Sequence, residues 1–198
     1  MKINLQILVL RNTLGLEDFM KATRFNFVRV VMALAAFAAI GFGFTGCQQE
    51  SETEYVYIYV EKLSKYDALI GNWSVTYDNG YKEQYNISTT AFDNNNGDGF
   101  GSYYAGKELC VSKLSDTEGY IYVKYTRSMN ADWSYSESAP DVGKWYAIHY
   151  EDLTDSSIKI SGAYKATGKT STGTLAEAIQ EFTVANGYFA SHSAVTKE

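Results

Sequence analysis

The chain has 198 residues, with 17 Lys and Arg against 23 Asp and Glu, and a formal net charge of −6. Five of the bases and two of the acids precede residue 47, so residues 47–198 carry 12 bases, 21 acids and a net charge of −9. This charge argues against nucleic acid as a partner, because phosphate contacts need clustered Lys and Arg. It also argues against polybasic attachment to anionic lipid.

The first part of the chain has the pattern of an export signal. Lys21, Arg24 and Arg29 precede an apolar run of 15 residues, Val30–Phe44. That run is shorter than the ~20 residues that a membrane-spanning helix needs, and small residues follow it. Residues 1–46 are therefore predicted to be a signal peptide. Its true start is expected at Met20, because the residues before this methionine do not belong to a normal signal.

The end of this segment, Phe44-Thr45-Gly46-Cys47, resembles the lipobox of bacterial lipoproteins, with Phe44 where that family usually has Leu. The resemblance implies that Cys47 carries a diacylglyceryl group and becomes the first residue of the mature protein. A membrane partner is then implied through the lipid on Cys47, with the domain outside the cytoplasm in a bacterial cell envelope, at the outer membrane if the host has one. The alternative is an uncleaved anchor in which Cys47 is idle.

Residues 47–66 are predicted to form a lipid-anchored tether. Gln48–Glu54 is polar and acidic, as suits a flexible linker. Tyr55–Val60 alternates strictly between tyrosine and aliphatic residues. This alternation fits either an added strand or extended tether.

From Gly71 onward, short β-prone runs alternate with turn signals, which predicts an all-β antiparallel meander closed into a small barrel. Strands are expected near residues 73–77, 81–92, 103–114, 120–127, 144–150 and 157–164, and a closing strand fits residues 188–195. Polar loops are expected at 93–99 and 128–142. Asp78-Asn79-Gly80 supplies the residues of a tight hairpin.

One amphipathic helix is predicted near the C-terminus. Thr174-Leu175-Ala176-Glu177 has the spacing of a capping box, in which Thr and Glu satisfy each other's end of the first turn. Apolar residues follow at helical spacing up to Phe182. Asn186-Gly187 is expected to end the helix, since both residues accept a left-handed conformation.

The domain, residues 67–198, resembles the lipocalin-like β-barrels. Gly71-Asn72-Trp73 matches the G-x-W of their first strand, and a meander and a C-terminal helix follow as in that family. The resemblance implies that Trp73 closes the barrel floor and that the barrel holds a small apolar ligand. The family's Arg over this Trp has no obvious equivalent, because Arg127 is the only arginine after Cys47 and lies mid-chain.

No group of residues in the sequence has the spacing of a catalytic or cofactor site. His149 and His192, the only histidines, are far apart and fit no zinc motif, so no metal site is predicted. Asn94–Gly99 matches a calcium loop only superficially, because Ala105 stands where a Glu ligand is needed. Cys110 lies between apolar neighbours and is interpreted as a small buried hydrophobe.

These observations leave two hypotheses for function, neither of them an enzyme. In the first, the barrel binds a small apolar or aromatic ligand, and a cavity of about 300 Å³ or more is expected between the strands. In the second, a filled barrel contacts a protein partner, as yet unknown, through its loops. Trp133 and Tyr135 lie on the long loop and are the candidate contact residues, either as a lid or as a docking surface.

Overall fold

The computed structural model describes residues 29–30, 58–65, 67–96 and 102–198. The chain forms two compact units, Met1–Val60 and Glu61–Glu198. In the first, strands β1 (Arg29–Val30) and β2 (Ile58–Tyr59) pair antiparallel, so part of the alternating Tyr55–Val60 run is a strand. The predicted signal peptide, apart from β1, lies outside the described residues, as does Cys47. Within the described ranges, no helix is long and apolar enough to cross a membrane.

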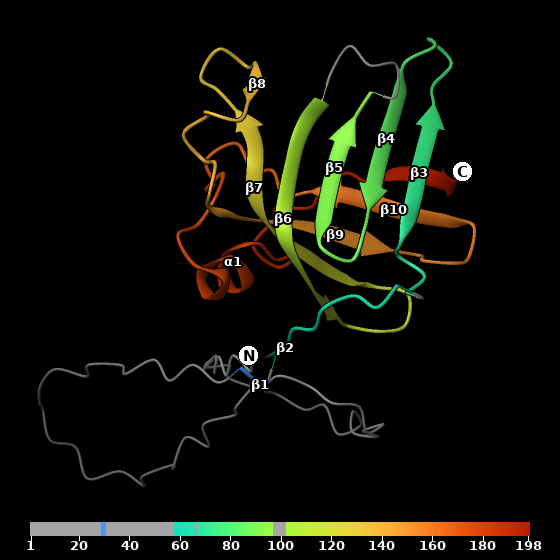
Figure 1. Cartoon of the computed structure of the whole chain (residues 1–198), viewed down its shortest axis with the longest axis horizontal. Helices are drawn as coiled ribbons and strands as arrows, with labels where there is room; N and C mark the ends of the chain where they lie inside the picture. The colour runs from blue at the N-terminus through green and yellow to red at the C-terminus, as the bar shows by residue number, and fades with distance from the viewer. Residues whose placement is uncertain (1–28, 31–57, 66, 97–101) are drawn as a thin grey trace, which may run out of the picture. The chain divides into compact units, whose positions relative to one another are not determined.

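The second unit is a closed antiparallel barrel, which confirms the predicted fold class. Each barrel strand pairs with its neighbours in chain order from β3 to β10, β11 lies between β10 and β3, and β6 pairs with β7. Among the described residues the eight barrel strands are β3 (Gly71–Thr76), β4 (Lys82–Ile87), β5 (Ala91–Asn95), β6 (Ser102–Lys113), β7 (Gly119–Met129), β9 (Trp145–Glu151), β10 (Ser157–Gly162) and β11 (Ser193–Lys197). In Figure 1, β3 to β6 lie in front, and β9 and β10 cross behind them.

The unit begins at Glu61, ahead of the expected start at residue 67. Glu61 exchanges two backbone hydrogen bonds with Val111 of β6, with N···O distances of 2.9 and 2.8 Å. Leu63 is buried shortly after it. The last residues assigned to the tether are therefore part of the barrel unit, because they have a strand to pair with and apolar surface to cover.

The predicted second strand, residues 81–92, is in fact two strands. The chain turns at Ser88-Thr89-Thr90 between β4 and β5. The Ser88 hydroxyl accepts hydrogen bonds from the amides of Thr90 (3.3 Å) and Ala91 (2.9 Å) and replaces the usual glycine-based turn. The predicted polar loop at Asp93–Gly99 is also corrected in part, since β5 continues to Asn95, while residues 97–99 lie outside the described ranges.

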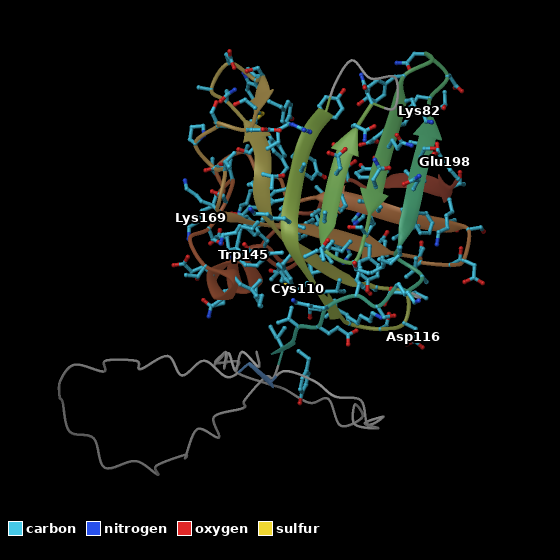
Figure 2. The ribbon with its side chains drawn as sticks, in the orientation of Figure 1. Lys82, Cys110, Asp116, Trp145, Lys169 and Glu198 are labelled. Atoms are coloured by element: carbon cyan, nitrogen blue, oxygen red, sulfur yellow. The ribbon has the colours of Figure 1, made fainter. Side chains whose placement is uncertain are left out.

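The C-terminal strand β11 closes the barrel, but it begins at Ser193 and runs to Lys197, later than the closing strand predicted at 188–195. Lys197 pairs with Trp73 of β3, and Ile158 of β10 pairs with Val195. The terminal Glu198 accepts hydrogen bonds from Lys82 (2.8 Å) and Gln84 (2.9 Å) of β4. Figure 2 labels Lys82 and Glu198 on the same side of the barrel. The end of the chain is thus held to the strand next to β3.

Helix α1 (Leu175–Glu181) has the predicted capping box at Thr174 and Glu177. It ends at Glu181 with Phe182 as its C-cap, earlier than the Asn186-Gly187 stop that the sequence suggested. Gly187 instead follows a further turn, with φ +80°. The helix packs against β9 and β7, and the Phe182 ring is completely buried against Tyr146 and Tyr188. Strand β9 is consequently covered on both faces.

Candidate functional site

A cavity of about 770 Å³ opens into the barrel unit, above the minimum of about 300 Å³ expected of a ligand-binding barrel. Its walls come from β4 to β7 and β9 to β11, from the loop that carries β8 (Tyr135–Ser136), and from the segments after β10 and just before β11. The aromatic residues of the lining are Tyr85, Tyr104, Tyr125, Trp133, Tyr135, Tyr146 and Tyr164. The cavity is therefore a tyrosine-rich chamber.

Three tyrosines of the lining form a packed cluster. The Tyr104 ring meets those of Tyr125 and Tyr146 edge-on, with centroids 6.4 and 5.3 Å apart, and Tyr125 stacks on Tyr146 at 4.7 Å. The hydroxyls of Tyr125 and Tyr146 hydrogen-bond, and Tyr146 donates to the Ala163 carbonyl at 3.1 Å. Burial raises the pKa of all three hydroxyls well above 10. The cluster therefore offers neutral aromatic surface and neutral hydroxyls.

One buried hydroxyl in the cavity wall has no hydrogen-bond partner. Ser128 of β7 is 3% exposed, and its Oγ contacts no donor or acceptor. Within the described residues, the only other side chain in this state is Tyr150, which does not line the cavity. A buried hydroxyl without a partner costs about 1–3 kcal/mol. A ligand with a polar atom near Ser128 would remove that cost.

The four charged side chains of the lining are already engaged within the protein. Glu83 accepts hydrogen bonds from the hydroxyls of Ser193 and Tyr85. Asp141 forms an ion pair with Lys144, and Lys169 forms one with Glu181. Lys165 donates a hydrogen bond to the Asn186 carbonyl. The distances run from 2.5 to 3.2 Å. Asp141 and Lys169 are thus neutralised by ion pairs, while Glu83 and Lys165 keep opposite charges that neutral groups hydrogen-bond. The formal charges of the four side chains sum to zero, which favours a neutral ligand.

Both residues predicted as loop contacts line this cavity. The indole of Trp133 is 72% exposed, and its backbone φ of +67° lies in the left-handed region. The turn that carries it is closed by hydrogen bonds between Asn130 and Ser134 (2.7 Å) and between the Trp133 amide and Asn130 (3.1 Å). Tyr135 packs edge-on against Tyr103 at 5.4 Å. The loop therefore places an exposed aromatic ring at the mouth of the chamber.

The predicted barrel signature, Gly71 and Trp73, lies outside the cavity lining and helps close the barrel. Trp73 is completely buried, and its Nε1 donates to the Leu69 carbonyl at 2.9 Å. The Lys197 ammonium lies 4.9 Å from the centroid of its ring and donates to the Ala68 carbonyl at 3.0 Å. The Lys197 ammonium therefore lies over the Trp73 ring, where the resemblance in sequence implied an arginine.

Cys110, interpreted from the sequence as a small buried hydrophobe, is largely but not fully buried. It lies on β6, where it is paired with Tyr122 of β7. Burial raises the pKa of its thiol to about 12, so the thiolate is scarce at neutral pH.

The two histidines, treated separately in the sequence, lie side by side. His149 Nδ1 is 2.8 Å from His192 Nε2, and His149 Nε2 is 3.3 Å from a carboxylate oxygen of Glu118. Glu151 offers a further carboxylate within 4.8 Å of these nitrogens. Burial lowers the pKa of His149, as does the neighbouring His192. Spacing along the chain gave no signal for this cluster, because it depends on the pairing of β9, β10 and β11.

No protein-family model, curated protein or solved structure matches this chain. The function is therefore proposed from the sequence pattern and from the geometry of these residues.

Proposed function

We propose that this protein is a membrane-anchored lipoprotein of the bacterial cell envelope whose barrel binds a small, neutral, aromatic or apolar ligand. The observation that carries the proposal is the chamber of about 770 Å³ with its tyrosine cluster. Ligand sites are mostly apolar and aromatic, with few polar groups that fix orientation. The unpartnered Ser128 hydroxyl is such a group.

The ligand is expected to be neutral and to carry at least one polar atom. The four charged side chains of the lining carry no net charge and are all bonded within the protein, and the buried tyrosines remain neutral at physiological pH. A flat ring stacks well on tyrosine faces, while its polar atom reaches Ser128. Trp133 at the mouth would cover the bound molecule.

Binding of a neutral fluorescent probe tests the proposal. We expect one N-phenyl-1-naphthylamine molecule to bind per chain, in a form that starts at Gln48 and needs no detergent. Ser128→Phe places a ring in the chamber and should weaken this binding at least tenfold, whereas Ser128→Ala keeps the space, lacks only the hydroxyl and should weaken binding less. Thermal unfolding checks that both variants fold.

Native mass spectrometry of the anchored protein from its own host complements the probe. A co-purifying adduct of a few hundred daltons is expected, and Ser128→Phe should lack it. Equal probe binding by both Ser128 variants would contradict the ligand-binding proposal. The exposed Trp133 ring would then favour the alternative, a display protein that contacts a partner through this loop.

A further inference from the structure

The pairing of three strands brings a second group of chemically active side chains together, apart from the cavity. His149 and Glu151 are two residues apart on β9, so they share one face of that strand. His149 pairs with Ser161 of β10, and the neighbouring Ile160 pairs with Ser193 of β11. His192, just before β11, therefore lies across β10 from His149. Figure 1 shows β10 beside the C-terminal strand.

The ligand atoms of this cluster lie close together. One atom each from His149, Glu151 and His192 lies within 4.8 Å of the other two. Nitrogen ligands lie 2.0–2.1 Å from zinc, so two ligand atoms of a tetrahedral site are about 3.3 Å apart. The two imidazole nitrogens are now 2.8 Å apart, at hydrogen-bond distance. An opening of about half an ångström, which the half-buried His192 can make, would admit the ion once the proton between the two nitrogens has left His192 Nε2.

The second nitrogen of His149, Nε2, has the carboxylate partner that a zinc-binding histidine usually has. An ionised carboxylate only accepts hydrogen bonds, so the contact between Glu118 and His149 Nε2 places the proton on Nε2. The lone pair of the neutral ring is then on Nδ1, which faces His192. A carboxylate that fixes the tautomer of a ligating histidine in this way is the usual outer partner of a zinc ligand.

The surroundings hold the His149 imidazole rigidly and leave His192 and Glu151 accessible. His149 is 1% exposed, between the rings of Tyr120 (5.0 Å) and Phe189 (5.4 Å). His192 and Glu151 are partly exposed, which gives an ion a path to the site. Lys159 lies 3.6 Å from one oxygen of Glu151, a distance too long for a strong hydrogen bond, so the carboxylate can turn to the ion.

We propose that His149, His192 and Glu151 bind a divalent transition-metal ion, with zinc as the best fit and Glu118 as the outer carboxylate. Two imidazoles select against Mg²⁺ and Ca²⁺, which prefer all-oxygen sites. Three protein ligands leave a fourth position for water, as in open zinc sites. The positive charge of the ion would also offset the negative charges of Glu118 and Glu151, the two carboxylates beside the histidines.

Metal binding by the full, lipid-anchored chain in detergent tests the proposal. After treatment with a chelator, the protein should take up one Zn²⁺ per chain by equilibrium dialysis, with excess Mg²⁺ or Ca²⁺ unable to displace it. Co²⁺ should bind at the same stoichiometry and give the intense visible absorption of a four-coordinate site. His192→Ala should weaken Zn²⁺ binding at least a hundredfold, and Glu118→Gln about ten- to hundredfold.

Asp155→Asn is the matched control, because Asp155 is an exposed carboxylate in the turn after β9 that is not part of the cluster. Its Zn²⁺ affinity should equal that of the natural chain. His192 is only partly buried, so its replacement tests the site without emptying the core, and thermal unfolding confirms the fold of each variant. Absence of stoichiometric Zn²⁺, or equal affinity in folded His192→Ala, would overturn the proposal.

Discussion

Removal of the Lys197 ammonium is expected to weaken the barrel where its last strand meets its first. Lys197→Met keeps most of the aliphatic stem over Trp73 and removes the charge. The ammonium lies 4.9 Å from the ring centroid of a fully buried Trp73, an interaction of about 0.5–2 kcal/mol. It also donates to the Ala68 carbonyl at 3.0 Å, and hydrogen bonds to charged groups contribute about 1.5–3 kcal/mol.

Because the site is only partly buried, we take the lower half of each range and expect a loss of about 2–3 kcal/mol. For a domain of this size that loss lowers the melting midpoint by roughly 5–10 °C. Urea unfolding followed by tryptophan fluorescence gives the free energy directly. Lys107→Met, which removes an exposed lysine of β6, is the matched control and should change the free energy by less than about 0.5 kcal/mol.

Gly71 provides an independent check of the same arrangement. A Cβ at this position would lie 2.5 Å from Cε of Lys197, and the φ of +149° is one that residues with side chains rarely adopt. Gly71→Ala should therefore displace the lysine, so that Lys197→Met costs little more in that background. The reasoning would be refuted if the stability losses from Gly71→Ala and Lys197→Met simply added, or if the Lys197→Met variant were as stable as the control.

Three further outcomes are expected. Phe182→Ala should cost about 3–5 kcal/mol, since its ring is fully buried, and an unchanged melting midpoint would show that the segment after α1 is loosely attached. In a Cys47→Ala chain at pH 8, Cys110 should react with iodoacetamide about a thousandfold more slowly than in the unfolded chain, because its pKa of about 12 leaves little thiolate. Cys47→Ser should abolish labelling by radioactive fatty acid, and labelling that persists would refute the proposed anchor.

The parts of the fold that the sequence predicted are those that local patterns determine. The capping box at Thr174 and the Asp78-Asn79-Gly80 turn each satisfy backbone groups within a few residues, so their composition identifies them. The split between β4 and β5 was missed, because the Ser88 hydroxyl makes a turn in a sequence that contains neither Gly nor Pro. A serine in a β-prone run does not indicate whether the strand continues or the chain turns at that residue.

The features that were missed depend on contacts between residues far apart in the chain. Lys197 reaches Trp73 only because β11 pairs with β3, and nothing near Lys197 marks it as the partner of a ring. Similarly, His149 and His192 meet through the register of three strands. The sequence predicted a cavity between the strands but not the residues that line it. Whether Ser128 has a hydrogen-bond partner depends on side chains from several strands.

The segment after α1 links the two proposed sites through direct contacts. Phe182 packs against Tyr146 in the cavity wall, and Phe189 packs against His149. Tyr146 and His149 are three residues apart on β9, so their side chains leave opposite faces of that strand. An ion bound by His149, His192 and Glu151 would fix the end of a segment whose start supports the tyrosine cluster. Zn²⁺ and ligand would then stabilise the same arrangement, and by linkage each should tighten the binding of the other by the same factor.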